Sequence, residues 1–105
     1  MHATAGLPIR MDPAARDAIV ERLRREPPEG WTADRPAPDV LVLRRGSQEH
    51  GERAVIRPSG TEPKLKAYLQ VVQPVEDDLA AARIAADARL QALRAEIETL
   101  IDRPG

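Results

Sequence analysis

The chain reads ERAVIRPSGTEPKLKAYLQVV from Glu52 to Val72, and this stretch decides the fold. Apolar residues alternate with polar residues on both sides of its centre, at Ala54, Ile56, Leu65, Ala67, Leu69 and Val71. Alternation with a period of two residues is typical of a strand that has one buried face. Residues 52–57 and 64–72 are therefore predicted as strands of an antiparallel sheet, with a loop between them.

The ten residues 57–66 combine the features of an anion-binding loop. The hydroxyls of Ser59 and Thr61 are hydrogen-bond donors, and Gly60 permits positive φ, so that successive backbone N–H groups can converge into a concave nest. Arg57 enters this loop, and a proline on each shoulder restricts the backbone before any ligand arrives. We interpret the loop as a rigid pocket for a phosphate group.

Lys64 and Lys66 leave the loop, and alternation along the strand places both on the same face as Tyr68. With Arg57 they surround the loop with positive charge. Turn statistics alone allow a plainer interpretation, a stiff turn, because Pro, Ser and Gly are standard turn residues. The cluster of one arginine, two hydroxyls, a glycine and two lysines is richer than a turn needs, but such a site binds rather than reacts, since nothing in the loop pairs a nucleophile with a base.

The residues before this stretch predict a strand, a helix and another strand. Residues 2–11 alternate with a period of two, and Pro8 favours an edge position for that strand. Asp12 is a predicted N-cap, with proline at the first helical position, for a helix that runs to Glu26. Residues 39–45 contain a continuous apolar run, which is typical of a strand well inside a sheet. Residues 29–38 are predicted to be irregular, with Trp31 at the edge of the core and a short strand at 31–33 as an option.

The last long element is an amphipathic helix, predicted from about Val75 to Ile101. The expected fold is a single two-layer α+β domain over residues 1–105. It has an antiparallel sheet of about four strands with two helices on one face, in the order β-α-β-β-β-α.

Composition limits the possible partners. The formal net charge of −1 gives no general attraction to nucleic acid or membranes, and we expect neither partner. The sequence contains no cysteine and no apolar run of membrane-spanning length, which is compatible with a cytoplasmic protein.

Other chemically versatile residues have plainer interpretations. His2 is terminal and His50 lies in a polar turn, so we predict no general base and no metal site. Asp77 and Asp78 are predicted to favour the start of the second helix. Charged residues along that helix are predicted to form a solvated face, at Arg83, Asp87, Arg89, Arg94 and Glu96.

The run Arg57-Pro-Ser-Gly-Thr-Glu-Pro-Lys64, followed by Leu65-Lys66-Ala67-Tyr68, closely resembles the phosphate-binding loop of the α-D-phosphohexomutases. This superfamily includes phosphoglucomutases and phosphomannomutases, and the loop lies in their C-terminal fourth domain. The opening run His2-Ala-Thr-Ala-Gly-Leu-Pro-Ile-Arg10 is similar to the start of that domain in the bacterial branch. The resemblance implies a small α+β domain similar in topology to the TATA-box-binding-protein fold.

The resemblance also implies a function. In these enzymes the loop holds the non-transferred phosphate of a hexose 1- or 6-phosphate of glucose or mannose, while a phosphoserine in another domain exchanges its phosphoryl group. Carried over to this chain, the phosphate contacts are Arg57, Ser59, Gly60 and Thr61, with Lys64 and Lys66 as electrostatic helpers.

The sequence lacks the catalytic serine segment, the magnesium-binding loop and the sugar-specificity loop of the family. We therefore expect no catalytic residue and no cofactor in this chain, with magnesium and the remaining three domains supplied by a parent isomerase of carbohydrate metabolism. The isolated chain would then bind substrate without performing the intramolecular phosphotransfer. The alternative is a free-standing regulatory module that binds phosphate or phosphosugars.

Overall fold

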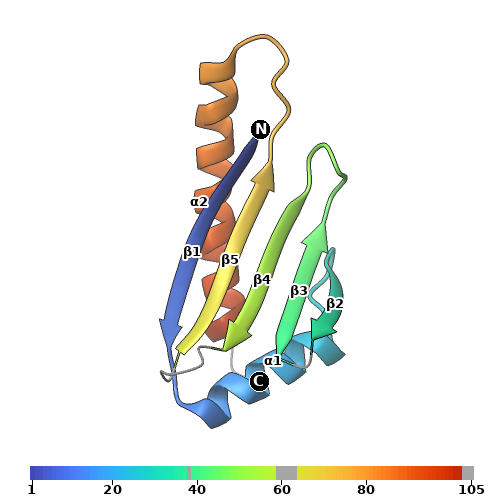
Figure 1. The fold of residues 1–105 in the computed structure, drawn as a ribbon, viewed down its shortest axis with the longest axis vertical. Coiled ribbons are helices and arrows are strands. Elements are labelled where there is room, and N and C mark those ends of the chain that lie inside the picture. Colours follow the sequence, from blue (N-terminus) through green and yellow to red (C-terminus); the bar gives the residue numbers. More distant parts are fainter. Residues whose placement is uncertain (38, 59–63, 103–105) are drawn as a thin grey trace.

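A computed structural model describes residues 1–37, 39–58 and 64–102 of the chain. Its elements, in order, are β1 (His2–Arg10), α1 (Pro13–Arg25), β2 (Thr32–Ala37), β3 (Val40–Arg45), β4 (Glu52–Pro58), β5 (Lys64–Val72) and α2 (Leu79–Asp102). The strands form one antiparallel sheet in the order β1-β5-β4-β3-β2 (Figure 1). The long strands β1 and β5 pair over their whole length, from His2 opposite Val72 to Arg10 opposite Lys64.

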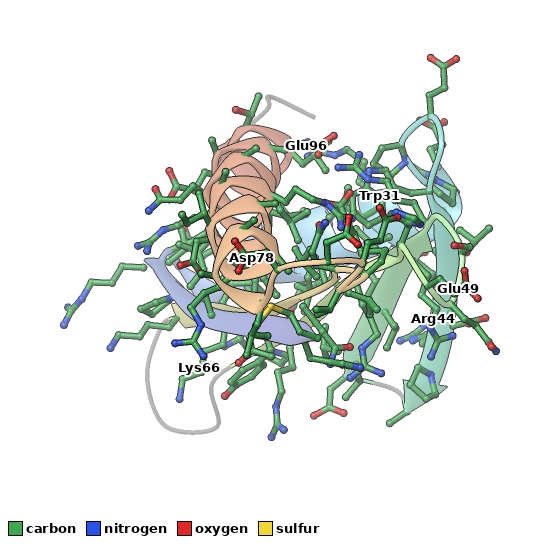
Figure 2. The ribbon with its side chains drawn as sticks, turned by 90° about the horizontal axis from the view of Figure 1, so that it is seen from above. Trp31, Arg44, Glu49, Lys66, Asp78 and Glu96 are labelled. Atoms are coloured by element: carbon green, nitrogen blue, oxygen red, sulfur yellow. The ribbon has the colours of Figure 1, made fainter. Side chains whose placement is uncertain are left out.

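The two faces of the sheet differ. Both helices pack against one face, which we call the inner face, and the core lies between these two layers (Figure 2). Aliphatic side chains from the sheet, α1 and α2 form one cluster with Trp31: Leu7, Leu23, Leu41, Leu43, Ala54, Ile56, Leu65, Ala67, Leu69, Val71, Leu93, Ile97 and Ile101. The opposite, outer face carries the alternate residues of each strand, including Lys66 and Tyr68 of β5.

The predicted two-layer α+β architecture is therefore confirmed, but the predicted strand number is wrong. The sheet has five strands rather than about four, and the order is β-α-β-β-β-β-α. The additional strand is β2, for which the sequence predicts at most a short strand at residues 31–33. Pro36 and the polar residues around it argue against a strand locally, yet β2 is an edge strand, where a missing N–H is tolerated. A shift in register between Asp34 and Ala37 accommodates the proline while pairing with β3 continues.

Two local predictions are confirmed near the N-terminus. β1 is an edge strand, as Pro8 suggested. Asp12 caps α1, because its Oδ1 accepts a hydrogen bond from the N–H of Ala15 at 2.9 Å, and Pro13 occupies the first turn. Since α1 directly follows β1, this cap fixes where the chain turns from the sheet into the helix.

The helix α2 begins at Leu79, four residues later than the predicted start at Val75. Asp78 explains the difference, since its Oδ1 accepts a hydrogen bond from the N–H of Ala80 at 2.9 Å and its carbonyl accepts one from Ala82 at 3.0 Å. The acidic residues thus precede the helix rather than form its first turn. Within the described part of the chain, neither α1 nor α2 combines the length and hydrophobicity needed to cross a membrane.

Two arginines hold α2 against the end of the sheet. Arg45 of β3 donates to Glu52 at 2.6 Å and to both carboxylate oxygens of Glu96, at 2.7 and 2.5 Å, and its guanidinium lies 4.2 Å from the ring centroid of Trp31. Arg89 of α2 donates to the carbonyls of Val72 and His50, at 2.8 and 2.9 Å. The prediction that Arg89 and Glu96 belong to a solvated face is therefore wrong.

Candidate functional site

The ends of β4 and β5 position the candidate phosphate-binding loop. β4 ends at Pro58 and β5 begins at Lys64, and within the described residues the last pair of this ladder joins Pro58 to Leu65. Behind these ends, Ile56 and Leu65 are completely buried in the core. Residues 59–63 are thus flanked by two strand ends that are fixed both by ladder hydrogen bonds and by packing.

Arg57 and Lys66 lie directly opposite each other on the outer face. Both side chains alternate with buried neighbours, so the predicted orientation of Arg57 away from Ala54 and Ile56 is confirmed. Like charges in directly opposite positions of two strands destabilise a sheet. Within the described residues, neither Arg57 nor Lys66 forms a hydrogen bond or an ion pair with another side chain. This pair therefore provides positive charge that an anion could neutralise.

Lys64 lies on the same face and pairs with Arg10, the last residue of β1. β1 ends, β4 ends and β5 begins at one end of the sheet (Figure 1), so the four basic residues Arg10, Arg57, Lys64 and Lys66 come together there. Arg10 was absent from the predicted site. Alternation within residues 2–11 gives the face on which Arg10 lies, but only the register between β1 and β5 brings it to Lys64.

Ser59, Gly60 and Thr61 lie outside the described residues. The structure therefore places three of the six predicted site residues, Arg57, Lys64 and Lys66, and the phosphate contacts of the other three stay predictions. The three that it places gather on one face and at one end of the sheet.

The electrostatics of this end favour anions. Four basic residues within neighbouring register positions attract a phosphate group over a screening length of about 10 Å at 0.1 M salt. Arginine can grip two phosphate oxygens at once, whereas lysine acts as a point charge. The described part of this end of the sheet therefore supplies charge and directional donors.

The two histidines lie away from this end. His2 starts β1, at the opposite end of that strand from Arg10, and its Nδ1 is 3.0 Å from Nε2 of Gln70. His50 lies in the turn between β3 and β4. In the residues that the structure describes, no three His, Asp or Glu side chains are grouped so that they could hold a metal ion.

Comparison with known proteins gives one match. Residues 10–91 match the family model described as phosphoglucomutase/phosphomannomutase, C-terminal domain. The match begins at Arg10 and includes the loop and all of β5. No curated protein and no solved structure matches the chain.

Proposed function

Because the chain belongs to the phosphoglucomutase/phosphomannomutase C-terminal domain family, we propose that it binds the phosphate group of a hexose phosphate through residues 57–66. In this proposal Arg57 grips the phosphate with its guanidinium, Ser59, Gly60 and Thr61 donate hydrogen bonds, and Lys64 and Lys66 add electrostatic attraction. The observation that carries the proposal is the pair of Arg57 and Lys66 at the two shoulders of the loop, which no carboxylate among the described residues neutralises.

In this proposal, catalysis takes place on other domains and not on this chain. The residues of this chain would hold and orient the phosphate that is not being transferred, and the bisphosphorylated sugar intermediate would present each of its phosphates to the loop in turn. The phosphoserine and magnesium ion of the reaction would belong to other domains of a phosphohexomutase. We propose a cytoplasmic setting, with which the absence of cysteine from the sequence is compatible.

An NMR titration of the ¹⁵N-labelled chain with glucose 1-phosphate tests this proposal. We expect a dissociation constant on the order of millimolar, because one loop makes few contacts and no second wall closes over the sugar. The largest amide shifts are expected at Ser59, Gly60 and Thr61, with smaller shifts at Lys64 and Lys66. Small uniform shifts, or shifts centred on another part of the sheet, would reject the assignment.

The variant Arg57→Gln should weaken this binding about tenfold, since it removes a charge-assisted hydrogen bond. The matched control is Arg83→Gln, which removes the same charge from an exposed position on α2. If the two variants bound glucose 1-phosphate equally well, the role proposed for Arg57 would be wrong.

A further inference from the structure

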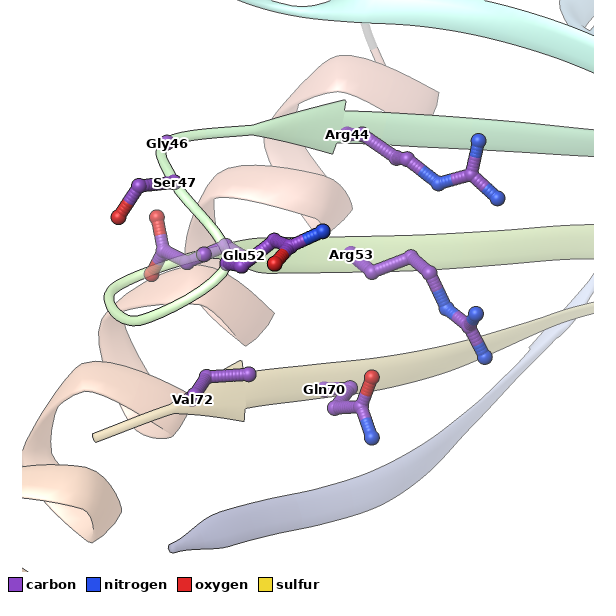
Figure 3. Close-up of a pocket in the computed structure, with 9 residues that line it drawn as sticks. Arg44, Gly46, Ser47, Glu52, Arg53, Gln70 and Val72 are labelled. Atoms are coloured by element: carbon purple, nitrogen blue, oxygen red, sulfur yellow. The ribbon is translucent and has the colours of Figure 1, made fainter. Parts of the chain in front are cut away.

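The outer face of the sheet carries a second group of cations, far from the loop. Arg44 of β3 and Arg53 of β4 lie directly opposite each other, and Gln70 of β5 continues the same row. Figure 3 shows the three side chains on neighbouring strands. This row lies four residues along β4 and β5 from the row that contains Arg57, which corresponds to about 13 Å at the usual rise of a strand.

The two arginines of this row differ in their partners. Arg44 forms an ion pair with Asp34 of β2 at 2.6 Å. Among the described residues Arg53 has neither a hydrogen-bond nor an ion-pair partner. Glu52, its neighbour in the chain, points to the inner face, where it accepts a hydrogen bond from Arg45. Arg53 is thus an exposed cation beside a second cation, and no carboxylate among the described residues neutralises it.

Arg53 and Gln70 also separate two hollows. One has a volume of about 300 Å³, extends from Arg53 to Arg44 and the β3–β4 turn, and is also lined by Glu52 (Figure 3). The other has a volume of about 400 Å³ and extends from Arg53 across Val55 and Tyr68 to β1. Each is large enough for part of a small organic molecule.

Tyr68 provides the floor of the larger hollow. Tyr68 is 46% exposed, although it lies in the second strand of the sheet and its neighbours Ala67 and Leu69 are buried. Opposite it lies Val55, and the neighbouring residue on β1 is Gly6, which leaves space beside the ring. An exposed ring without a side chain on one flank can accept a flat or apolar group.

We propose that Arg53, Gln70 and Tyr68 form a second ligand site for a small phosphorylated molecule that has a planar part. The phosphate lies at Arg53, beside Arg44 and beside Gln70, whose Nε2 lies 3.0 Å from Nδ1 of His2, and the planar part rests on Tyr68. The sheet uses the same arrangement here as at the loop, namely two cations in opposite positions of neighbouring strands. The site is separate from the loop, so its existence does not depend on the function proposed above.

The net charge of −1 does not by itself indicate a basic stripe beside an aromatic residue. The register assembles one, because the paired residues of the outer face include Arg10, Arg44, Arg53, Arg57, Lys64 and Lys66 around Tyr68. Among the described paired residues of this face, Asp34 is the one carboxylate, and Arg44 binds it.

Adenosine 5′-monophosphate, which has a phosphate and a flat ring, is a suitable probe for this site. In NMR titrations of the full chain we expect it to shift the amides of Arg53, Tyr68 and Gln70. Inorganic phosphate should shift Arg53 without Tyr68, and adenosine should bind more weakly than the monophosphate. The variant Arg57→Gln should preserve all three shifts, since it changes only the loop.

The variant Arg53→Gln should weaken binding of adenosine 5′-monophosphate at this site about tenfold. Arg53→Lys keeps the charge but loses the planar fork, and should have an intermediate effect. Arg83→Gln on α2 is the control of equal charge. The proposal is overturned if Arg53→Gln titrates like Arg83→Gln, or if the probe shifts only residues near the loop. It is also overturned if a single-stranded oligonucleotide binds more tightly than the monophosphate and shifts the whole outer face, Arg10 included.

Discussion

At the scale of single residues, Arg45 connects more parts of the molecule than its position at the end of a short strand suggests. Its side chain is 28% exposed, it stacks on Trp31, and it binds Glu52 and Glu96. The hydrogen bond with Glu96 raises the pKa of Arg45, burial opposes this, and the hydrogen bond with Glu52 raises it again. The guanidinium therefore stays charged at the junction of β3, β4 and α2.

Replacing Arg45 should destabilise the fold. Arg45→Met removes the cation over Trp31 and leaves Glu52 and Glu96 without their main partner, and should lower the free energy of unfolding by about 1–3 kcal/mol. Urea denaturation measures the free energy of unfolding. The neighbouring Arg44→Met, which loses one ion pair between exposed side chains, should change this free energy by less than about 1 kcal/mol. Equal losses in the two variants would contradict the role assigned to Arg45.

Glu21 shows the effect of an exposed ion pair on titration. Hydrogen bonds from Arg24 lower the pKa of Glu21, desolvation opposes this, and the charges of Arg24, Arg35 and Arg25 lower it further. The pKa of Glu21 is lower in the folded chain than in the unfolded chain. The ion pair of Glu21 with Arg24 therefore stabilises the fold at pH values above the unfolded-state pKa of Glu21. That contribution disappears as the pH falls through the folded pKa.

An NMR titration of the Glu21 carboxyl carbon tests this directly. Its midpoint should be higher in Arg24→Gln than in the original chain, because the first cause of the shift is removed. Arg25→Gln, the control on the same helix, should raise the midpoint less. A midpoint that did not move in Arg24→Gln would show that the hydrogen bonds do not persist in solution.

At the scale of elements, the sequence predicts those strands and helices whose signals are local. α1 has its cap and its proline in adjacent positions, and β5 alternates over its whole length. β2 could not be predicted in full, because Pro36 opposes a strand locally and pairing with β3 decides the outcome. The late start of α2 did have a local signal, the N-cap position of Asp78 before Leu79, but two further acidic residues obscure which one is the cap.

Substitutions on the buried face and on the exposed face of α2 should change the stability by very different amounts. Ile97 is completely buried in the core, and Ile97→Ala should lower the free energy of unfolding by about 2–5 kcal/mol through lost burial and the cavity left behind. Ile84 is 72% exposed on the same helix, and Ile84→Ala should change stability by less than about 0.5 kcal/mol. Thermal or urea unfolding distinguishes the two, and a similar loss in both would show that α2 packs on the sheet through a different face.

At the scale of the whole molecule, the register of the sheet builds the charged sites. Local alternation predicts that Arg57, Lys64 and Lys66 leave the loop on one face. The contributions of Arg10 and Arg53 depend on which residues of distant strands are opposite one another, and nothing within a single strand specifies this. This explains why the loop can be identified from its residues, while the positive face around it needs the folded chain.

The single core predicts how the molecule unfolds. Trp31, the only tryptophan, is 6% exposed and belongs to the same cluster as the buried residues of both helices. Trp31 fluorescence follows the unfolding of the β2 end of the molecule, whereas far-ultraviolet circular dichroism follows mainly the unfolding of the helices. Since one cluster joins these parts, the urea midpoints of the two unfolding transitions should coincide.

The variant Ile97→Ala sharpens this test. It removes core volume from α2, so it should move the fluorescence and circular-dichroism midpoints to lower urea by the same amount. If Trp31 became exposed at a lower urea concentration than that at which the helices unfold, β2 and the loop before it would unfold separately. The edge strand would then contribute little to the stability of the remaining sheet, and the charged rows of β4 and β5 would stay assembled without it.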